Sequence, residues 1–383
     1  MIYREAKNTV LRLAEQFPVV AITGARQTGK TTLAKIAFPE KKYVSFDDEE
    51  IRNLAKDNPK DFLKAFNEGA IIDEAQKLPE IFNAIKIDVD EGKYFPGKFI
   101  LTGSSQFRLK ENISDSLAGR IGILNLAPLS ISELKNDNLI KDDFYKLILN
   151  GFYPPLYDHE KKFNRSDWYK NYVGSYLNLD VKDYINPANL NLFQNFLISC
   201  AHHSGQILNV DSITKKLGVS AVTGKKWLSV LSSSFIVHLV YPKFSNNLKS
   251  IVKKPKLYFY DTGLLCYLLR ITSVEELLLS PYKGAIVETA AISELIKGRY
   301  NKGLDGDIYF LRANGTFEID VIANWDKDYA IEIKSSTTEK AKTENNLSKV
   351  DNILNHKHKK LIYYTGDIST KSSKISYVSW KDW

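Results

Sequence analysis

Short runs of apolar, β-branched residues alternate with stretches of helical periodicity over the first third of the chain. Five of these runs have the length and composition of strands, and they lie at residues 19–23, 42–46, 70–73, 98–102 and 121–126. Strands that alternate with helices are typical of a parallel sheet with helices on both of its faces. The first third therefore predicts an α/β fold built around a parallel sheet.

The other two thirds show two further patterns. Residues 139–184 are mainly helical, with a turn at 150–155, and residues 192–244 predict a helix, a helix–turn–helix and strands. The last third returns to α/β, with a helix near 284–297 and four strands after it. We predict three domains, with limits at 1–138, 139–270 and 271–383.

Composition restricts the class of protein. The chain has 383 residues, of which 44% are hydrophobic and 26% are charged, and these are ordinary values for a globular protein. No apolar run approaches the ~20 residues of a membrane span, so we expect no membrane partner. Only Cys200 and Cys266 are present, which excludes a disulfide framework and indicates a reducing, cytoplasmic location.

The net charge of +8 is unevenly distributed along the chain. Residues 151–270 carry 15 basic and 7 acidic residues, whereas the segments before and after them are each neutral. A localised excess of positive charge suggests a polyanion as a partner. The alternative is a solvated basic face without a ligand.

A phosphate-binding loop follows the first predicted strand. Residues 24–31 match G-x-x-x-x-G-K-[ST] in full, and a helical stretch comes next, as this motif requires. In such a loop backbone N–H groups surround a phosphate, Lys30 reaches the β- and γ-phosphates, and the Thr31 hydroxyl ligates Mg²⁺. ATP and Mg²⁺ are therefore the expected cofactors. The expected nucleotide-binding residues of the loop are Gly24, Ala25, Arg26, Gln27, Thr28, Gly29, Lys30, Thr31 and Thr32.

Residues at the ends of later strands extend this prediction. Asp73 and Glu74 end an apolar strand, where Asp73 would hold Mg²⁺ and Glu74 would orient or deprotonate the attacking water. Thr102 and Ser104 follow another strand, and their hydroxyls are candidates for the γ-phosphate, because the carboxyl ends of parallel strands line one crevice. Arg120, just before the fifth strand, is a candidate arginine finger, in cis or from a neighbouring subunit of a homo-oligomer.

Together these motifs resemble those of bacterial and archaeal AAA-type ATPases that carry a C-terminal domain of unknown function. The resemblance spans nearly the whole chain and rests on GARQTGKTT, FDDEE, IIDEAQ, FILTGSS, SLAGR, LAPLSISE, the turn at 150–155, YFYDTGL, residues 284–288 and EIKSS. It implies a P-loop ATPase domain, a winged-helix middle and a restriction-endonuclease-like α/β domain at the end.

The basic middle segment has the pattern of a helix–turn–helix. A capped helix at 211–218 precedes a second helix at 221–231 and a strand at 235–241 that would form a wing. Lysines on the second helix of such a module can enter the major groove of DNA. The alternative is a module that connects domains or binds another subunit. The expected DNA-binding residues are Lys215, Lys216, Lys225 and Lys226, with further phosphate contacts from Lys253, Lys254 and Lys256.

Two alternating runs in the last third predict a β-hairpin with a second acidic site. In a hairpin that turns at 324–328, Asp320 lies opposite Glu332, and two facing carboxylates suit a Mg²⁺ ion. Lys334 shares their face and is a candidate to polarise a phosphate, and Glu288 adds a carboxylate from an apolar helix. This set matches the PD-(D/E)XK nuclease pattern that the resemblance implies. The alternative is a surface hairpin with an ion pair.

These observations predict Mg²⁺-dependent binding and hydrolysis of ATP, coupled to an action on DNA, with a candidate nuclease site in the last third. Two other classes of function stay open. One is a nucleotide switch that binds protein partners without cutting, and the other is a DNA-binding regulator whose nuclease fold is inert. The sequence does not separate ATP from GTP and does not give the oligomeric state.

Overall fold

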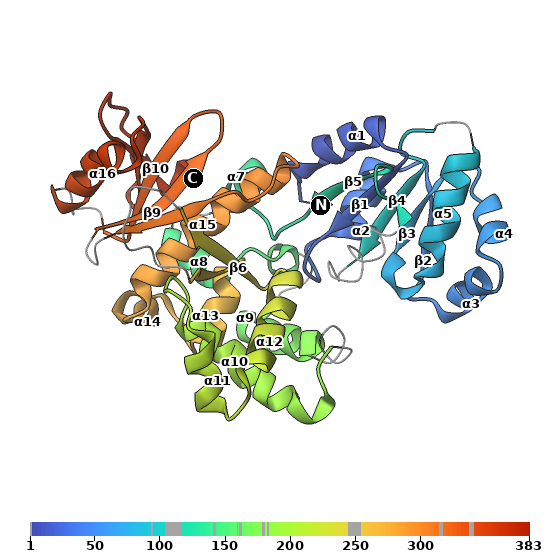
Figure 1. Cartoon of the computed structure of the whole chain (residues 1–383), viewed down its shortest axis with the longest axis horizontal. Coiled ribbons are helices and arrows are strands. Elements are labelled where there is room, and N and C mark those ends of the chain that lie inside the picture. Colours follow the sequence, from blue (N-terminus) through green and yellow to red (C-terminus); the bar gives the residue numbers. More distant parts are fainter. Residues whose placement is uncertain are drawn as a thin grey trace.

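Two β-sheets joined by a helical region make up the described part of the chain (Figure 1). The computed structural model describes residues 2–92, 95–103, 116–140, 143–158, 160, 163–177, 181, 184–243, 254–313, 317–336 and 341–383. The first sheet belongs to the N-terminal third, and the second sheet takes its strands from the second half of the chain.

The N-terminal sheet has five parallel strands in the order β2-β3-β4-β1-β5. The strands are β1 (Val19–Thr23), β2 (Lys42–Ser45), β3 (Ala70–Asp73), β4 (Phe99–Gly103) and β5 (Ile121–Asn125). All five residues of β1 are buried, which is why this strand is a continuous apolar run. The predicted parallel sheet is confirmed, and it is typical of P-loop nucleoside triphosphatases.

Helices cover both faces of this sheet. The helices α1 (Ala6–Gln16) and α2 (Lys30–Ala37) pack on the face to which Val20 and Ile22 point. The opposite face, with Val19 as one of its residues, is covered by α3 (Glu49–Asp57), α4 (Pro59–Lys64) and α5 (Glu80–Glu91). A short 3₁₀ helix, η1 (Ala75–Lys77), follows β3.

The helical region follows the first sheet in sequence, and two strands of the second sheet, β6 (Val237–Pro242) and β7 (Lys256–Phe259), come before its last two helices. It contains α7 (Ile131–Asn136), α8 (Phe144–Asn150), η2 (Pro154–Tyr157), α9 (Arg165–Tyr176), η4 (Pro187–Asn189), α10 (Leu190–His202), α11 (Val210–Leu217), α12 (Ala221–Ser233), α13 (Thr262–Leu268) and α14 (Val274–Leu279). The predicted helix–turn–helix corresponds to α11 and α12, since Gly218 ends the first in a left-handed conformation and Ser220 caps the second. At Gly224 the two helices pack closely, because a Cβ there would lie 2.1 Å from the Thr214 methyl group.

The second sheet has seven strands in the order β12-β11-β10-β9-β8-β6-β7. Its strands are β6 (Val237–Pro242), β7 (Lys256–Phe259), β8 (Tyr309–Ala313), β9 (Phe317–Asn324), β10 (Asp328–Lys334), β11 (Lys359–Tyr364) and β12 (Ser376–Ser379). The strands β6 and β7, which follow the helix–turn–helix, therefore extend the sheet of the last third. The domain limit at residue 270 separates strands of one sheet and stays a prediction.

The 19-residue helix α15 (Lys283–Asn301) connects the two halves of the molecule (Figure 1). It contacts β10 and β7 of the second sheet and also β5 of the first. The remaining elements of the last third are α16 (Ala341–Leu354) and η5 (Trp380–Asp382). No helix in the described residues is both long enough and apolar enough to cross a membrane.

Candidate functional site

The phosphate loop has a shape that its glycines make possible. Gly24 and Gly29 have φ angles of +155° and +89°, and a Cβ on Gly24 would lie 2.1 Å from the backbone oxygen of Leu126. Gly29 is the N-cap of α2, so the N-terminus of that helix opens on to the loop. The buried Lys30 donates from Nζ to the backbone oxygens of Gly24 and Ala25, at 3.0 and 2.7 Å. These contacts hold its ammonium group against the loop.

Asp73, at the end of β3, accepts hydrogen bonds from three hydroxyl groups. Thr31 donates to Oδ1 at 2.9 Å, Tyr43 donates to Oδ2 at 2.9 Å, and Thr102 also donates to Oδ1. Burial and the Asp73 carboxylate raise the pKa of Tyr43 to about 12. Mg²⁺ prefers hard oxygen ligands with few protein contacts, so the joined Thr31 hydroxyl and Asp73 carboxylate fit this ion. The structure thus brings together three residues that the sequence placed at this site.

Glu74 follows directly and has a backbone conformation that is uncommon for a residue with a Cβ. Its φ of +52° and ψ of +41° are left-handed, and the Gln76 amide donates to its carboxylate. A pocket of about 300 Å³ is lined by Glu74, by the loop and by Ser175 of α9. The loop residues that line it are Arg26, Gln27, Gly29, Lys30, Thr31 and Thr32. The turn after β3 therefore aims Glu74 at the predicted phosphate pocket.

A larger pocket, of about 820 Å³, adjoins the first one. The two pockets share Gln27, Gly29 and Thr32 at the start of α2. The larger pocket also has an apolar wall formed by Ile2, Leu33, Ile36, Leu129, Pro155 and Tyr157. An apolar pocket beside a phosphate loop suits the base and sugar of a nucleotide. The last two of these residues belong to η2, so the helical region helps to close the site.

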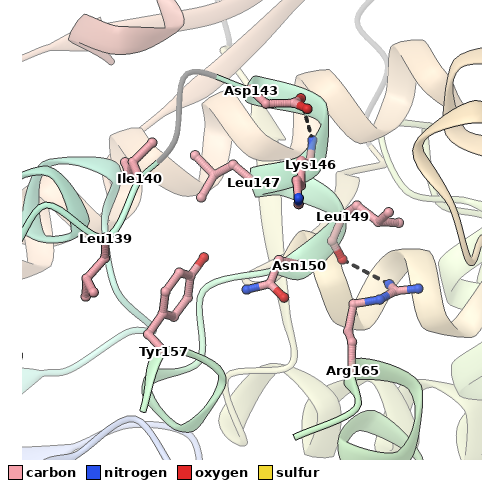
Figure 2. A pocket seen from close by; sticks show the side chains of 9 residues that line it. All are labelled: Leu139, Ile140, Asp143, Lys146, Leu147, Leu149, Asn150, Tyr157 and Arg165. Carbon is pink, nitrogen blue, oxygen red and sulfur yellow. Dashed lines mark hydrogen bonds between the residues drawn. The ribbon is translucent and has the colours of Figure 1, made fainter. Parts of the chain in front are cut away.

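A third cavity, of about 360 Å³, lies among α8, η2 and the start of α9 (Figure 2). It shares Tyr157 with the larger pocket, and the Tyr157 hydroxyl donates to the backbone oxygen of Gly151 at 2.6 Å. Its Arg165 side chain donates to the backbone oxygen of Leu149 at 2.9 Å. The polar ends of Tyr157 and Arg165 are thus used in hydrogen bonds to backbone oxygens. Among the described residues, none of the site residues predicted from the sequence lines this cavity.

Arg120 lies far from the phosphate loop of its own chain. It precedes β5 whereas the loop follows β1, and the two strands are parallel neighbours, so a strand length of about 16 Å separates them. Its guanidinium binds Asp90 of α5 through Nε at 2.5 Å and Nη2 at 2.9 Å. This position does not fit a role for Arg120 as an arginine finger in its own chain. A role as an arginine finger for a neighbouring subunit stays a prediction. Ser104, the remaining predicted residue, lies outside the described residues.

The four lysines predicted to bind DNA are exposed on the helix–turn–helix. Lys215 and Lys216 lie in the last turn of α11, and Lys225 and Lys226 lie on α12. Of the three further lysines, Lys253 is outside the described residues, Lys254 is exposed and Lys256 is buried. The surface of the two helices therefore presents positive charge to solvent.

Lys256, on β7, faces the acidic residues of the last third. Its Nζ lies 3.1 Å from Glu288, 2.6 Å from Glu318 and 3.9 Å from Asp320, and its side chain is 5% exposed. The prediction that Lys256 contacts phosphate is wrong, because its ammonium group is buried and paired with carboxylates. The sequence does not reveal this arrangement, since β7 joins the sheet through β6, and β6 pairs with β8 more than sixty residues further along the chain.

The predicted acidic residues do come together around this lysine. The hairpin of β9 and β10 has the predicted register, and Asp320 accepts a hydrogen bond from the Ile333 backbone at 2.8 Å. Burial and the charge of Asp320 raise the pKa of Glu288 to about 7 and that of Glu332 to about 8. Lys334 forms an ion pair with Glu332 at 2.9 Å. The like charges of the carboxylates are thus balanced by two lysines.

The cluster of Glu288, Glu318, Asp320 and Glu332, called here the acidic cluster, does not form a metal cage as it stands. Within the described ranges, no three His, Cys, Asp or Glu side chains are arranged to hold a metal ion. The ammonium group of Lys256 takes the position between carboxylates that a cation would occupy. This arrangement fits a lysine and not a metal ion, and the metal ligands of the last third stay a prediction.

The sequence did not reveal three residues of these sites. Tyr43 and Ser175 reach the phosphate site from β2 and α9, and their positions depend on the strand order and on long-range packing. Arg4, which precedes α1, contacts the phosphate loop itself. A single arginine before a helix carries no signal of such a contact.

Three family models match the chain, each over a part of it. Residues 16–135 match an AAA domain, residues 141–275 match a domain of unknown function (DUF8612), and residues 283–383 match a domain of unknown function (DUF4143). The first and third matches confirm the predicted order of an AAA-type domain and a C-terminal domain of unknown function.

Curated relatives and solved structures extend the comparison. Uncharacterized proteins of Mycobacterium tuberculosis and Mycobacterium bovis are each 27% identical over 339 residues, which is 88% of this chain and 74% of theirs. The Walker-type ATPase PABY2304 of Pyrococcus abyssi is 15% identical, with a TM-score of 0.46 over 69% of this chain and 95% of that one. The RuvB Holliday junction branch migration motor of Thermotoga maritima is 18% identical, with a TM-score of 0.34 over 62% and 89%. The match of residues 16–135 to an AAA domain agrees with the first sheet, which is typical of P-loop nucleoside triphosphatases.

Proposed function

We propose that the N-terminal domain binds ATP with Mg²⁺ and hydrolyses it. The observation that carries this proposal is the contact between Thr31 and Asp73 beside the phosphate loop. The two residues are 42 positions apart in the chain, and the Thr31 hydroxyl donates a hydrogen bond of 2.9 Å to the Asp73 carboxylate. These two residues would hold Mg²⁺, which supplies positive charge against the phosphates when it is bound.

The other residues of the pocket have separate tasks in this proposal. Lys30 neutralises the β- and γ-phosphates, and the N–H groups of the loop bind their oxygens. Glu74 faces the same pocket and accepts a proton from the attacking water, or orients it. The base and sugar lie in the larger apolar pocket, where η2 contacts them. The helix α9 lines the smaller pocket, which holds the phosphates.

Arg120 acts on a neighbouring copy of the chain in this proposal. Its place before β5 puts it beyond reach of its own loop, whereas its ion pair with the exposed Asp90 holds the guanidinium at the surface. A second copy that docks its phosphate pocket on this surface would receive the arginine, and charge on the transferred phosphoryl group would then be stabilised in trans. The proposal thus includes a homo-oligomer.

Steady-state hydrolysis of ATP and GTP by the purified chain, with Mg²⁺ and with a chelator, tests the proposal. Lys30→Ala and Glu74→Gln should each lower kcat by at least about 100-fold, whereas Glu74→Gln should still bind nucleotide. Lys56→Ala, at an exposed position on α3, is the matched control. Hydrolysis that survives in Lys30→Ala, or no nucleotide binding by the wild type, would overturn the proposal.

We also propose that the helix–turn–helix binds nucleic acid. Four exposed lysines on two adjacent helices, inside the segment that holds the whole net charge of +8, support this proposal. Contacts with phosphates release counterions, so the affinity for duplex DNA should fall steeply with salt. Lys225→Gln/Lys226→Gln should weaken binding, whereas the exposed pair Lys371→Gln/Lys374→Gln is the control of equal charge. An affinity for DNA that changes neither with salt nor in the Lys225→Gln/Lys226→Gln variant would favour the alternative that the helix–turn–helix binds a protein.

We do not extend the proposed function to cleavage of nucleic acid. Lys256 and Lys334 form ion pairs with carboxylates of the acidic cluster, and this arrangement favours an internal ion-pair network. Cleavage therefore stays a prediction, and its test is the Lys256 variant described in the Discussion.

A further inference from the structure

Arg4 makes three directed contacts around the phosphate loop, although it lies outside the loop motif. Its side chain is 7% exposed, and its Nη1 donates to the backbone oxygen of Thr28. Its Nη2 donates to the backbone oxygen of Ala127 at 2.8 Å, and its Nε donates to Glu133 at 2.9 Å. The guanidinium thus ties the loop to the segment that leaves β5 and to helix α7.

The contact with Thr28 fixes the direction of the next N–H group. No peptide bond in the described residues is cis, and in a trans peptide the C=O and the following N–H point in opposite directions. A hydrogen bond that holds the Thr28 carbonyl towards Arg4 therefore turns the Gly29 N–H away from it. Gly29 lines the phosphate pocket and has a φ of +89°. Because it is a glycine, it has no side chain that would resist rotation of this peptide.

Glu133 keeps the arginine in place. Its carboxylate is fully buried, and it binds Arg4 Nε while it also accepts the backbone N–H of Ser130 at 2.9 Å in the capping box of α7. A planar guanidinium can satisfy a carboxylate and two carbonyls at once, whereas a lysine ammonium has no fixed fork. The chemistry of this position therefore requires arginine, and not only a positive charge.

We infer that Arg4 is a positioning residue for the nucleotide: it holds the Thr28 carbonyl so that the Gly29 N–H faces the phosphates. The inference rests on the proposed binding of ATP, and it goes beyond the loop motif because the residue lies 20 positions before Gly24. Arg4 also lines the larger pocket, so removal of its side chain would leave a space that is open to small solutes.

Binding of ADP and hydrolysis of ATP by Arg4→Lys, Arg4→Ala and Glu133→Gln test the inference. We expect Arg4→Lys to raise the Kd for ADP and the KM for ATP by about tenfold, with a much smaller change in kcat, because the loop is misaligned before the chemical step. Low, non-denaturing concentrations of guanidinium should restore part of the affinity of Arg4→Ala and none of that of Lys30→Ala. Arg12→Lys, on the exposed side of α1, is the matched control.

The outcomes separate this inference from the proposed function. A wild type that binds no nucleotide removes the proposed function and this inference with it. A wild type that requires Lys30, together with a folded Arg4→Lys whose Kd and KM are unchanged, overturns the inference alone. Thermal unfolding without nucleotide monitors folding, and a loss of affinity in Arg4→Ala that guanidinium cannot rescue would assign Arg4 a purely structural role.

Discussion

The Glu294 carboxylate of α15 accepts a hydrogen bond of 2.7 Å from the backbone N–H of Ile131, across 163 positions of the chain. Ile131 is the first residue of α7, where backbone N–H groups have no partner within the helix and the helix dipole favours a negative charge. Glu294 also binds Lys297 at 2.8 Å, and both side chains are buried. A helix of the C-terminal half therefore caps the segment that leaves the N-terminal sheet.

Glu294→Gln should destabilise the chain through this contact. Glutamine can still accept the Ile131 N–H, but Lys297 loses the buried charge that balances it, and removal of one partner of a buried ion pair costs about 3–5 kcal/mol. Urea denaturation should show a lower midpoint. The double variant Glu294→Gln/Lys297→Met should recover much of the loss, and the exposed Glu275→Gln is the control. A single variant as stable as the wild type would contradict the role given to this pair.

Tyr43→Phe should weaken the use of Mg²⁺ without abolishing hydrolysis. The Tyr43 hydroxyl holds Oδ2 of Asp73, the carboxylate proposed to hold the ion, and loss of such an outer contact typically costs roughly tenfold or more in metal affinity. The measurement is the Mg²⁺ concentration that gives half of the maximal ATPase rate. Tyr241→Phe, at an exposed tyrosine of β6, controls for the loss of a hydroxyl. An unchanged Mg²⁺ requirement would show that Tyr43 does not orient Asp73.

The elements that the sequence predicted well are those whose signals are local. The strand runs, the glycines of the phosphate loop and the glycine that ends α11 each depend on neighbours within a few residues, and the predicted limits of the first five strands differ from the observed ones by at most one residue. Lys256 shows where this reasoning ends: its place in the basic middle segment suggested a phosphate ligand, but its partners are set by strand pairing between distant segments. Tyr43 is similar, because only the sheet order places it beside Asp73.

Mixed samples of two inactive variants should test the trans role of Arg120. Arg120→Ala should bind ATP but hydrolyse it slowly, and Lys30→Ala should lack binding. In a mixed oligomer, the intact Lys30 of one copy meets the intact Arg120 of its neighbour, so part of the activity should return when the variants are combined. The readout is the ATPase rate across mixing ratios. Wild-type activity of Arg120→Ala alone would remove the arginine from the mechanism.

Lys256→Met should convert the acidic cluster into a site that responds to divalent cations. The substitution removes the ammonium group from between Glu288, Glu318 and Asp320, and the uncompensated carboxylates should lower stability by about 3–5 kcal/mol. Added Mn²⁺ should then raise the melting temperature of the variant more than that of the wild type.

Asp320→Asn in the same background should cancel the effect of Mn²⁺. Plasmid DNA incubated with each protein and Mn²⁺ shows in the same experiment whether the uncompensated carboxylates support cleavage. A variant that gains no stabilisation from Mn²⁺ would show that Lys256 does not hold the place of a cation, and intact plasmid in every sample would remove the nuclease prediction.

His238 on β6 should make the stability of the second sheet depend on pH. Burial lowers the pKa of His238 to about 4, and its Nδ1 lies 3.1 Å from the Tyr260 hydroxyl. Because the unfolded chain binds a proton near pH 6.5 and the folded chain does not, stability falls as the pH falls from about 6.5 towards 4. His238→Gln should remove this dependence, which we expect to reach about 2 kcal/mol between pH 7 and pH 5 in urea denaturation. His202→Gln, on the exposed side of α10, is the control, and equal slopes for the wild type and His238→Gln would show that His238 is protonated in the folded chain.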